Sequence, residues 1–254
     1  EDALTSISAR LGELTRLIKL YLYDSDVAAL PETIGNLVRL NILDVAHNHL
    51  VAVPESLGRL TKLTFLYLTD NQLTTLPEAL FAEMGELAYL NVGDNPLSAL
   101  PDSLGELIRL QELRMDNTGV TALPDAVGNL VMLKELHARN NSLTTLPESV
   151  GELTMLRRLY LQGNVLEKLP DAVGGLKNLT ELDLRNNRLT EVPEAIGELS
   201  NLAYLDLRGN RLTKLPASIG NMPKLEKLDL RWNPLAELPN WMVRLEDRGC
   251  SVYV

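Results

Sequence analysis

The segment LTELDLRNNRLTEVPEAIGEL (residues 179–199) contains the pattern that decides the fold. The same arrangement of letters recurs in LNILDVAHNHLVAVPESLGRL (40–60) and in LTFLYLTDNQLTTLPEALF (63–81). Aligned, the three segments give the consensus LxxLxLxxNxLxxLPxxIGxLxx, which has a period of 23 residues. A fixed period of this length is typical of a repeat protein.

The asparagine of the consensus gives the register of the whole chain. Its ten positions follow one another at steps of 23, except for a step of 24 between Asn71 and Asn95, where one residue is inserted around Phe81 and Ala82. These positions are Ser25, Asn48, Asn71, Asn95, Thr118, Asn141, Asn164, Asn187, Asn210 and Asn233. The repeat therefore extends over nearly all of the 254 residues.

Each repeat divides into two halves. The LxLxL alternation is typical of a short strand with one buried face, so the repeats together predict a parallel sheet. The second half, in which an acid usually follows a proline, predicts a short helical segment on the convex side. A recurring glycine in this half, as at Gly35 and Gly128, is expected where the backbone turns tightly.

The asparagine itself is expected to be buried, with its amide bonded to backbone groups of its own and adjacent repeats. Ser25 and Thr118 offer fewer hydrogen-bonding atoms at this position, and we expect looser connections between repeats there.

With this consensus the chain resembles the leucine-rich repeat proteins, in the 23-residue form found in intracellular Ras-group proteins and in many bacterial repeat proteins. The resemblance implies an α/β repeat fold: a curved solenoid with a concave parallel β-sheet of about ten strands and short convex helices. It also implies that the concave sheet binds other macromolecules, usually proteins, and that the chain has neither catalytic residues nor a cofactor.

The two ends leave the pattern. Leu11 and Leu14 fall on positions of the second half of a repeat, so residues 1–17 are predicted to be a truncated half-repeat with further sequence upstream. Residues 18–239 hold the ten repeats, and residues 240–254 are predicted to form a C-terminal cap made of a short helix and a final strand. Cys250 is interpreted as a small buried residue of this cap, because no histidine lies near it in sequence.

Composition excludes several classes of protein. A single cysteine cannot form a disulfide framework, which favours an intracellular, cytoplasmic protein or an exported bacterial protein that acts inside a host cell. No segment approaches the roughly 18 apolar residues of a membrane span, so no membrane contact is predicted. The net charge of −10, without a basic block, argues against a nucleic-acid partner.

The positions that flank the inward-facing leucines are the candidate binding residues, because they face the concave surface. They hold eight of the eleven aromatic residues, and five of these eight lie in the first four repeats. Strand propensity is one explanation, but tyrosine, tryptophan and arginine also dominate protein interfaces, and the clustering favours binding. The predicted partner-binding residues are Tyr21, Tyr23, Phe65, Tyr67, Tyr89, Arg114, His137, Arg139, Arg158 and Tyr160.

Register also predicts which side chains are neighbours, since adjacent strands lie about 4.8 Å apart. The central column is Tyr21, Asp44, Tyr67, Asn91, Arg114, His137, Tyr160, Asp183, Asp206 and Asp229. The next column outward is Tyr23, Ala46, Thr69, Gly93, Asp116, Arg139, Gln162, Arg185, Arg208 and Arg231. The last three repeats are therefore predicted to hold rows of aspartate and arginine that neutralise one another.

The concave positions also carry a gradient of charge. Their net charge is −4 in the first four repeats, 0 in the next three and +2 in the last three. The first four repeats are thus the most acidic part of this face as well as the most aromatic.

One group of residues resembles the beginning of a metal site. His47 is placed between Asp24 and Asp70, with His49 and Asp26 one column away. The favoured interpretation is an exposed histidine whose protonated form is stabilised by the flanking acids. No metal site is predicted.

The sequence favours a binding function over an enzymatic one, because GxxxxGK, GxSxG and HExxH motifs are absent from it. The favoured hypothesis is a non-catalytic module that binds a protein partner on its concave face, either as a monomeric solenoid or as part of a longer chain. One alternative is the recognition domain of a larger catalytic protein, such as a secreted bacterial effector, a ubiquitin ligase or a kinase. The other is a designed or purely structural solenoid, against which irregular positions such as Gly93 and Thr118 argue.

Overall fold

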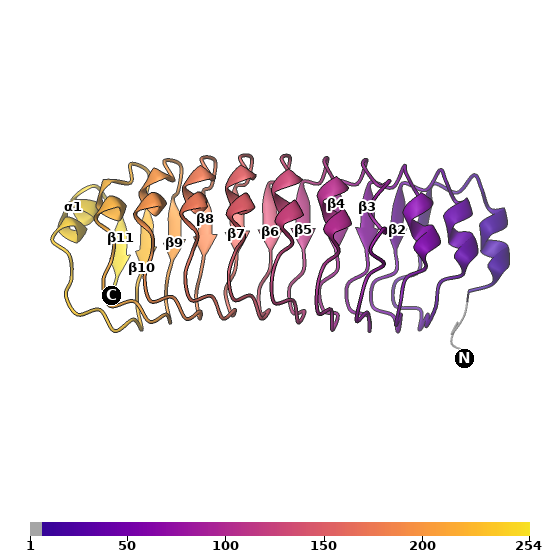
Figure 1. The fold of residues 1–254 in the computed structure, drawn as a ribbon, viewed down its shortest axis with the longest axis horizontal. Coiled ribbons are helices and arrows are strands. Elements are labelled where there is room, and N and C mark those ends of the chain that lie inside the picture. The colour runs from indigo at the N-terminus through magenta and orange to yellow at the C-terminus, as the bar shows by residue number, and fades with distance from the viewer. Residues whose placement is uncertain (1–6) are drawn as a thin grey trace.

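The structure, a computed structural model, describes residues 7–254. These residues form one parallel sheet of 11 strands, in which each strand pairs with its neighbours in sequence. The strands lie side by side along the molecule, and a row of short helices covers one face of the sheet (Figure 1). The predicted solenoid and its parallel sheet are confirmed. The strands are β1 (Lys19–Tyr21), β2 (Ile42–Asp44), β3 (Phe65–Tyr67), β4 (Tyr89–Asn91), β5 (Glu112–Arg114), β6 (Glu135–His137), β7 (Arg158–Tyr160), β8 (Glu181–Asp183), β9 (Tyr204–Asp206), β10 (Lys227–Asp229) and β11 (Ser251–Tyr253).

The helices of the opposite layer are 3₁₀-helices of five residues each, most of which begin directly after a proline. The inserted residue near Phe81 replaces the helix between β3 and β4 by turns, and the Phe81 side chain is fully buried there. No helix among residues 7–254 is long and apolar enough to cross a membrane. The 3₁₀-helices are η1 (Ala9–Glu13), η2 (Glu32–Asn36), η3 (Glu55–Arg59), η4 (Asp102–Glu106), η5 (Asp125–Asn129), η6 (Glu148–Glu152), η7 (Asp171–Gly175), η8 (Glu194–Glu198) and η9 (Ala217–Asn221).

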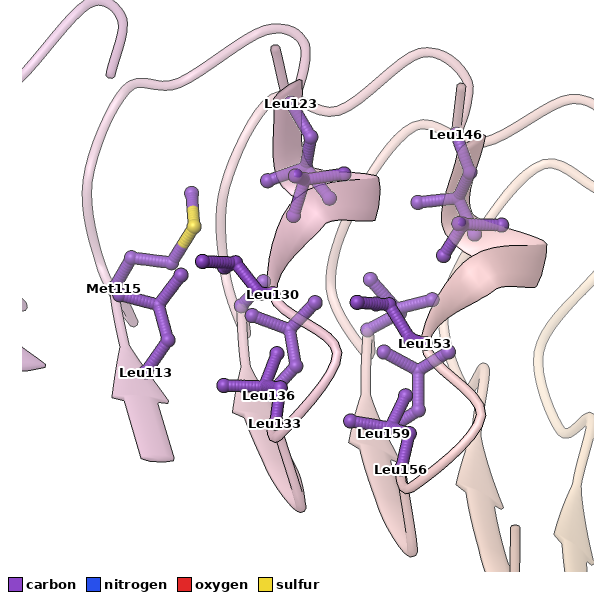
Figure 2. Close-up of a cluster of buried hydrophobic side chains, with 14 of the residues drawn as sticks. Leu113, Met115, Leu123, Leu130, Leu133, Leu136, Leu146, Leu153, Leu156 and Leu159 are labelled. Carbon is purple, nitrogen blue, oxygen red and sulfur yellow. The ribbon is translucent and has the colours of Figure 1, made fainter. Parts of the chain in front are cut away.

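The consensus leucines fill the space between the two layers. Figure 2 shows strand residues such as Leu136 and Leu159 packed against Leu130 and Leu153, which follow the helices. All four side chains are completely buried, and each such burial contributes roughly 1.5–3 kcal/mol. Because every repeat adds the same set, one continuous core runs along the solenoid.

The asparagine ladder connects each repeat to the one before it. The Nδ2 of Asn187 donates to the carbonyl of Leu161 in the preceding repeat at 2.9 Å, and its Oδ1 accepts from the backbone N–H of Leu166 at 3.0 Å. The Thr118 hydroxyl instead donates to Met115 of its own repeat, at 3.4 Å, and to Asn141 of the next repeat. Within the described residues its side chain makes no hydrogen bond to the preceding repeat, as the sequence predicts.

The recurring glycine has a different cause from the one predicted. A Cβ atom at Gly35 would lie 2.4 Å from the carbonyl oxygen of Ser56, and one at Gly128 would lie 2.7 Å from Ser149. Neither glycine has a positive φ. The column is therefore required by the close approach of successive helices and not by a tight turn.

The two ends of the solenoid differ. At the C-terminus, α1 (Trp241–Asp247) packs on η9 and buries Trp241 and Leu245, while β11 extends the sheet. Cys250, which lies between α1 and β11 in the sequence, is also buried. α1 and β11 are the helix and strand expected in the cap. At the N-terminus, Leu14 is 52% exposed. Residues 1–6 of the predicted half-repeat lie outside the described residues.

Candidate partner-binding surface

The ten predicted binding residues all lie on one face of the sheet. Most are strand residues, while Tyr23 and Arg139 lie two residues beyond the ends of β1 and β6. The buried leucines between them, such as Leu66, point to the other side. The ten predicted binding residues form two groups. The aromatic patch, on β1 to β4, contains Tyr21, Tyr23, Phe65, Tyr67 and Tyr89. The central network, on β5 to β8, contains Arg114, His137, Arg139, Arg158 and Tyr160 together with Glu112, Glu135 and Glu181.

The aromatic patch exposes ring surface to solvent. Tyr21 and Tyr23 are 52% and 58% exposed. The rings of Tyr67 and Tyr89 lie 4.8 Å apart between centroids, and Phe65 lies 6.4 Å from Tyr89. Burial raises the pKa of both Tyr67 and Tyr89, and their neutral hydroxyls can donate hydrogen bonds at physiological pH.

The acids beside the aromatic patch form local pairs with histidines. His47 Nδ1 lies 2.8 Å from an Asp70 oxygen, and His49 Nε2 lies 3.2 Å from Asp26. The hydrogen bond to Asp70, with the charges of Asp70 and Asp24, raises the pKa of His47, which agrees with the preferred interpretation of this group. The four side chains form two separate pairs and not one three-ligand cluster.

His137 is the one predicted binding residue that the structure buries. Only 4% of it is exposed, because its ring lies 4.8 Å from that of Tyr160. Burial lowers the pKa of His137, and the charges of Arg114 and Arg139 add to this effect, against the opposing hydrogen bond to the Glu135 carboxylate. The side chain of His137 therefore lies beneath the surface, where little of it is open to contact from solvent.

The rest of the central network surrounds Tyr160. The guanidinium of Arg139 lies 4.3 Å from the centre of the Tyr160 ring, and the Tyr160 hydroxyl donates to Glu181 at 2.9 Å. Burial and this hydrogen bond raise the pKa of Tyr160 to about 12. The ten predicted binding residues do not include Glu112, Glu135 or Glu181. The sequence did contain a signal for these glutamates. The fixed spacing of 23 residues places Glu112, Glu135 and Glu181 in one column, directly next to the central column.

Glu112, Glu135 and His137 form the one group of three metal-ligating side chains, among residues 7–254, whose ligand atoms all lie within 4.8 Å of one another. His137 Nε2 lies 3.1 Å from Glu135 and 3.9 Å from Glu112. Both carboxylates already have cationic partners, Arg114 on Glu112 and Arg158 on Glu135 at 2.7 Å. The positive charges of these arginines oppose the binding of a metal cation, and the group is arranged as an ionic network.

The last three repeats carry the Asp–Arg ladder, which contains Asp183, Arg185, Asp206, Arg208, Asp229 and Arg231. Each aspartate accepts a 2.7 Å hydrogen bond from the arginine two residues further on, and Arg208 also lies 3.3 Å from Asp229 of the next repeat. Burial raises the pKa of Asp229, but hydrogen bonds from Arg231 and the charge of Arg208 outweigh it and hold that pKa below its usual value. The predicted neutralising rows are confirmed.

Trp232, beside the ladder, is a feature whose conformation the sequence analysis missed. In each repeat, the residue directly before the asparagine-ladder position has a left-handed backbone. Asparagine, aspartate and glycine tolerate this conformation. Trp232 occupies this position with a φ of 61°. At 73% exposed, it is the most exposed of the large apolar residues within the described part of the chain.

Several solved structures have the same fold. The ectodomain of the membrane receptor kinase GASSHO1/SCHENGEN3 from Arabidopsis thaliana, in complex with CASPARIAN STRIP INTEGRITY FACTOR 2, is 31% identical over 94% of this chain and 30% of its own, with a TM-score of 0.83. The plant peptide hormone receptor RGFR1 in complex with RGF2 is 28% identical over 97% of this chain and 45% of its own, with a TM-score of 0.84. The functional domain of InlJ from Listeria monocytogenes is 26% identical over 89% of this chain and 46% of its own, with a TM-score of 0.76.

The chain spans less than half the length of each of these three structures. Comparison with curated proteins gives no match. The family model of the leucine-rich repeat region matches residues 5–98, 98–191 and 148–231, which together cover most of the sequence. The repeat consensus, the parallel sheet and this match agree, and the chain belongs to the leucine-rich repeat family.

Proposed function

We propose that this chain is a protein-interaction module that binds its partner through the aromatic patch, with the exposed arginines of the central network as the adjoining contact. The observation that carries this proposal is the exposure of Tyr21 and Tyr23 next to the ring pair Tyr67–Tyr89. Tyrosines supply large contact area at low cost in side-chain entropy, and they are frequent hot spots of protein interfaces.

The comparisons support the class of function. The GASSHO1/SCHENGEN3 ectodomain is in complex with CASPARIAN STRIP INTEGRITY FACTOR 2, and RGFR1, a peptide hormone receptor, is in complex with RGF2. Both have the fold of this chain at TM-scores above 0.8. A peptide or protein partner is therefore the class that we propose here.

We further propose that binding occurs without catalysis and without a cofactor. Burial raises the pKa of the Cys250 thiol, which makes it a poor nucleophile. His137 is enclosed by Tyr160 and by carboxylates that arginines already hold. We keep the division into a half-repeat (1–17), repeats (18–239) and a cap (240–254), and an intracellular site of action, as proposals.

A second candidate is a recognition domain within a larger protein. It is favoured by one observation, that the chain corresponds to only 30% of the GASSHO1/SCHENGEN3 ectodomain and 45% of RGFR1. The proposed binding surface of this chain is the same for both candidate functions.

A random-peptide display library selected on the wild-type protein tests the proposal. The selected peptides should lose binding to a variant with Tyr21, Tyr67 and Tyr89 changed to alanine. The matched control changes Tyr204 and Trp232, two aromatic residues near the C-terminal end that are 47% and 73% exposed. It should bind the peptides as the wild type does.

Thermal unfolding of both variants should stay close to that of the wild type, because the substituted side chains lie outside the leucine core. Peptides that bind the triple variant with undiminished affinity, or that lose binding to the control to the same extent, would contradict the proposal.

A further inference from the structure

Asp44 occupies the same position in its repeat as the three aspartates of the Asp–Arg ladder. Its Oδ1 accepts a hydrogen bond from the backbone N–H of Ala46 at 3.1 Å. In the ladder, Asp183 accepts from the N–H of Arg185 at the same distance. The carboxylate of Asp44 is therefore held in place by the same backbone contact, before any partner arrives.

The residue two positions further on makes the difference. In the ladder it is an arginine, and the guanidinium of Arg185 closes on Asp183 through Nε at 3.0 Å and Nη2 at 2.7 Å. After Asp44 it is Ala46, which ends at a methyl group. Among residues 7–254, no lysine, arginine or histidine forms an ion pair with Asp44.

Tyrosines stand on both sides of this carboxylate. Tyr21 on β1 and Tyr67 on β3 are the register partners of Asp44. After burial, the charge of Asp44 is the next largest effect that raises the pKa of Tyr67, as expected for close neighbours. Asp44 itself is half-buried and therefore partly open to solvent, and Tyr21 beside it is 52% exposed.

The chain itself shows what such a site accepts. The guanidinium of Arg139 lies 4.3 Å from the centre of the Tyr160 ring on the same face, which is a cation–π contact. Two donors of one guanidinium also match two carboxylate oxygens in the ladder. A lysine ammonium has no such planar pair of donors.

We propose that Asp44, between Tyr21 and Tyr67, binds an arginine side chain of the protein partner. That guanidinium takes the position which the ladder arginines fill from within the chain. The inference rests on the proposed function, because it names one chemical feature of the partner. The acidic character of the first four repeats, a net −4 over the concave positions, favours the approach of a cation.

The direct test is an NMR titration of the isotopically labelled protein with N-acetyl-arginine amide, and separately with N-acetyl-lysine amide. The arginine compound should give saturable shifts at Tyr21, Asp44 and Tyr67, and the lysine compound should bind several-fold more weakly. The shifts should disappear in Asp44→Asn and in Ala46→Arg, which supplies the missing arginine from within the chain. Gln162→Arg is the matched control, since it adds the same charge in the same column beside Tyr160, and it should leave the shifts unchanged.

Peptides selected on the wild type provide the second readout. Those that compete with N-acetyl-arginine amide should contain arginine and should lose about 10- to 100-fold in affinity for Ala46→Arg, the effect of a lost charge-assisted contact. Ala46 is only 5% exposed, so thermal unfolding of Ala46→Arg is measured alongside, and Asp44→Asn, which adds no volume, should lose the same arginine-dependent binding.

Equal binding of the arginine compound by wild type and Asp44→Asn, equal binding of the lysine compound, or no saturable shift would each overturn the inference. These results are separable from failure of the proposed function. Peptides that need the aromatic patch but tolerate Ala46→Arg would leave the proposed function standing and remove the arginine site.

Discussion

At the C-terminal end of the sheet, in β8 to β10, each aspartate of the central column is held by an arginine two residues further along the chain. At the N-terminal end, the same column carries Tyr21, Asp44 and Tyr67, and the outward position after Asp44 is an alanine. Both regions share the strand register and the continuous leucine core. Their outward side chains differ, and these decide whether the polar groups are satisfied within the chain or left for another molecule.

This difference shows how a repeat protein separates folding from binding. The ladder charges neutralise one another, so that region offers few groups whose hydrogen bonds a partner could complete. The aromatic patch offers exposed rings and a carboxylate without a cationic partner. Because the inward positions are the same throughout, the outward positions can change without loss of the fold.

The largest expected effect tests whether the two regions share one core. Leu66 on β3 and Leu205 on β9 are 0% and 1% exposed, and both point into the same continuous cluster. Leu66→Ala and Leu205→Ala should each lower the free energy of unfolding by about 2–5 kcal/mol. Urea unfolding followed by circular dichroism checks this. A difference between the two variants of more than about 3 kcal/mol, the width of this range, would show that the regions are not built alike.

A smaller effect is expected where the regions differ. Asp229 is fully buried and accepts hydrogen bonds from Arg231, so Asp229→Asn should cost about 1–3 kcal/mol. Asp44→Asn should cost less than about 0.5 kcal/mol, because Asp44 has no cationic partner among the described residues. Similar costs at both positions would remove the distinction between a satisfied ladder and an open site.

The pH dependence of the stability lost in Asp229→Asn has a defined sign. The pKa of Asp229 is lower in the folded chain than its usual value. A carboxyl of this kind stabilises the fold above its unfolded pKa of about 3.9, and it loses that contribution as the pH falls toward the folded value. The stability difference between wild type and Asp229→Asn should therefore be constant above about pH 5 and shrink below about pH 4. Chemical unfolding at a series of pH values measures it, and a difference that grew on acidification would show that the sign is wrong.

The sequence predicted the repeating part of this molecule well because the period transfers position from one repeat to the next. The strands, the asparagine ladder and the pairing of Asp183 with Arg185 all follow from that period. The depth of a side chain does not follow from it. His137 lies in the same column as Tyr21, yet Tyr160 covers it, because depth depends on how neighbouring rings lean across the strands.

The candidate site was predicted in outline and incompletely in detail. Its aromatic residues follow from their column, whereas Glu112, Glu135 and Glu181 were not among the predicted binding residues, because their column reveals only that they face the same side. The left-handed backbone of Trp232 was missed for another reason. A conformation shared by ten repeats is visible only in structure, and tryptophan is an unusual residue for it.

The central claim is that the partner contacts the aromatic patch and not the ladder end. Its most direct measurement is photo-crosslinking with benzoylphenylalanine placed at Tyr23 or at Tyr204, which are 58% and 47% exposed. Peptides selected on the wild-type protein are irradiated with each variant, and the covalent adducts are quantified by mass spectrometry. We expect adducts from position 23 and only background from position 204. Adducts from position 204 alone, or in equal yield from both positions, would contradict it.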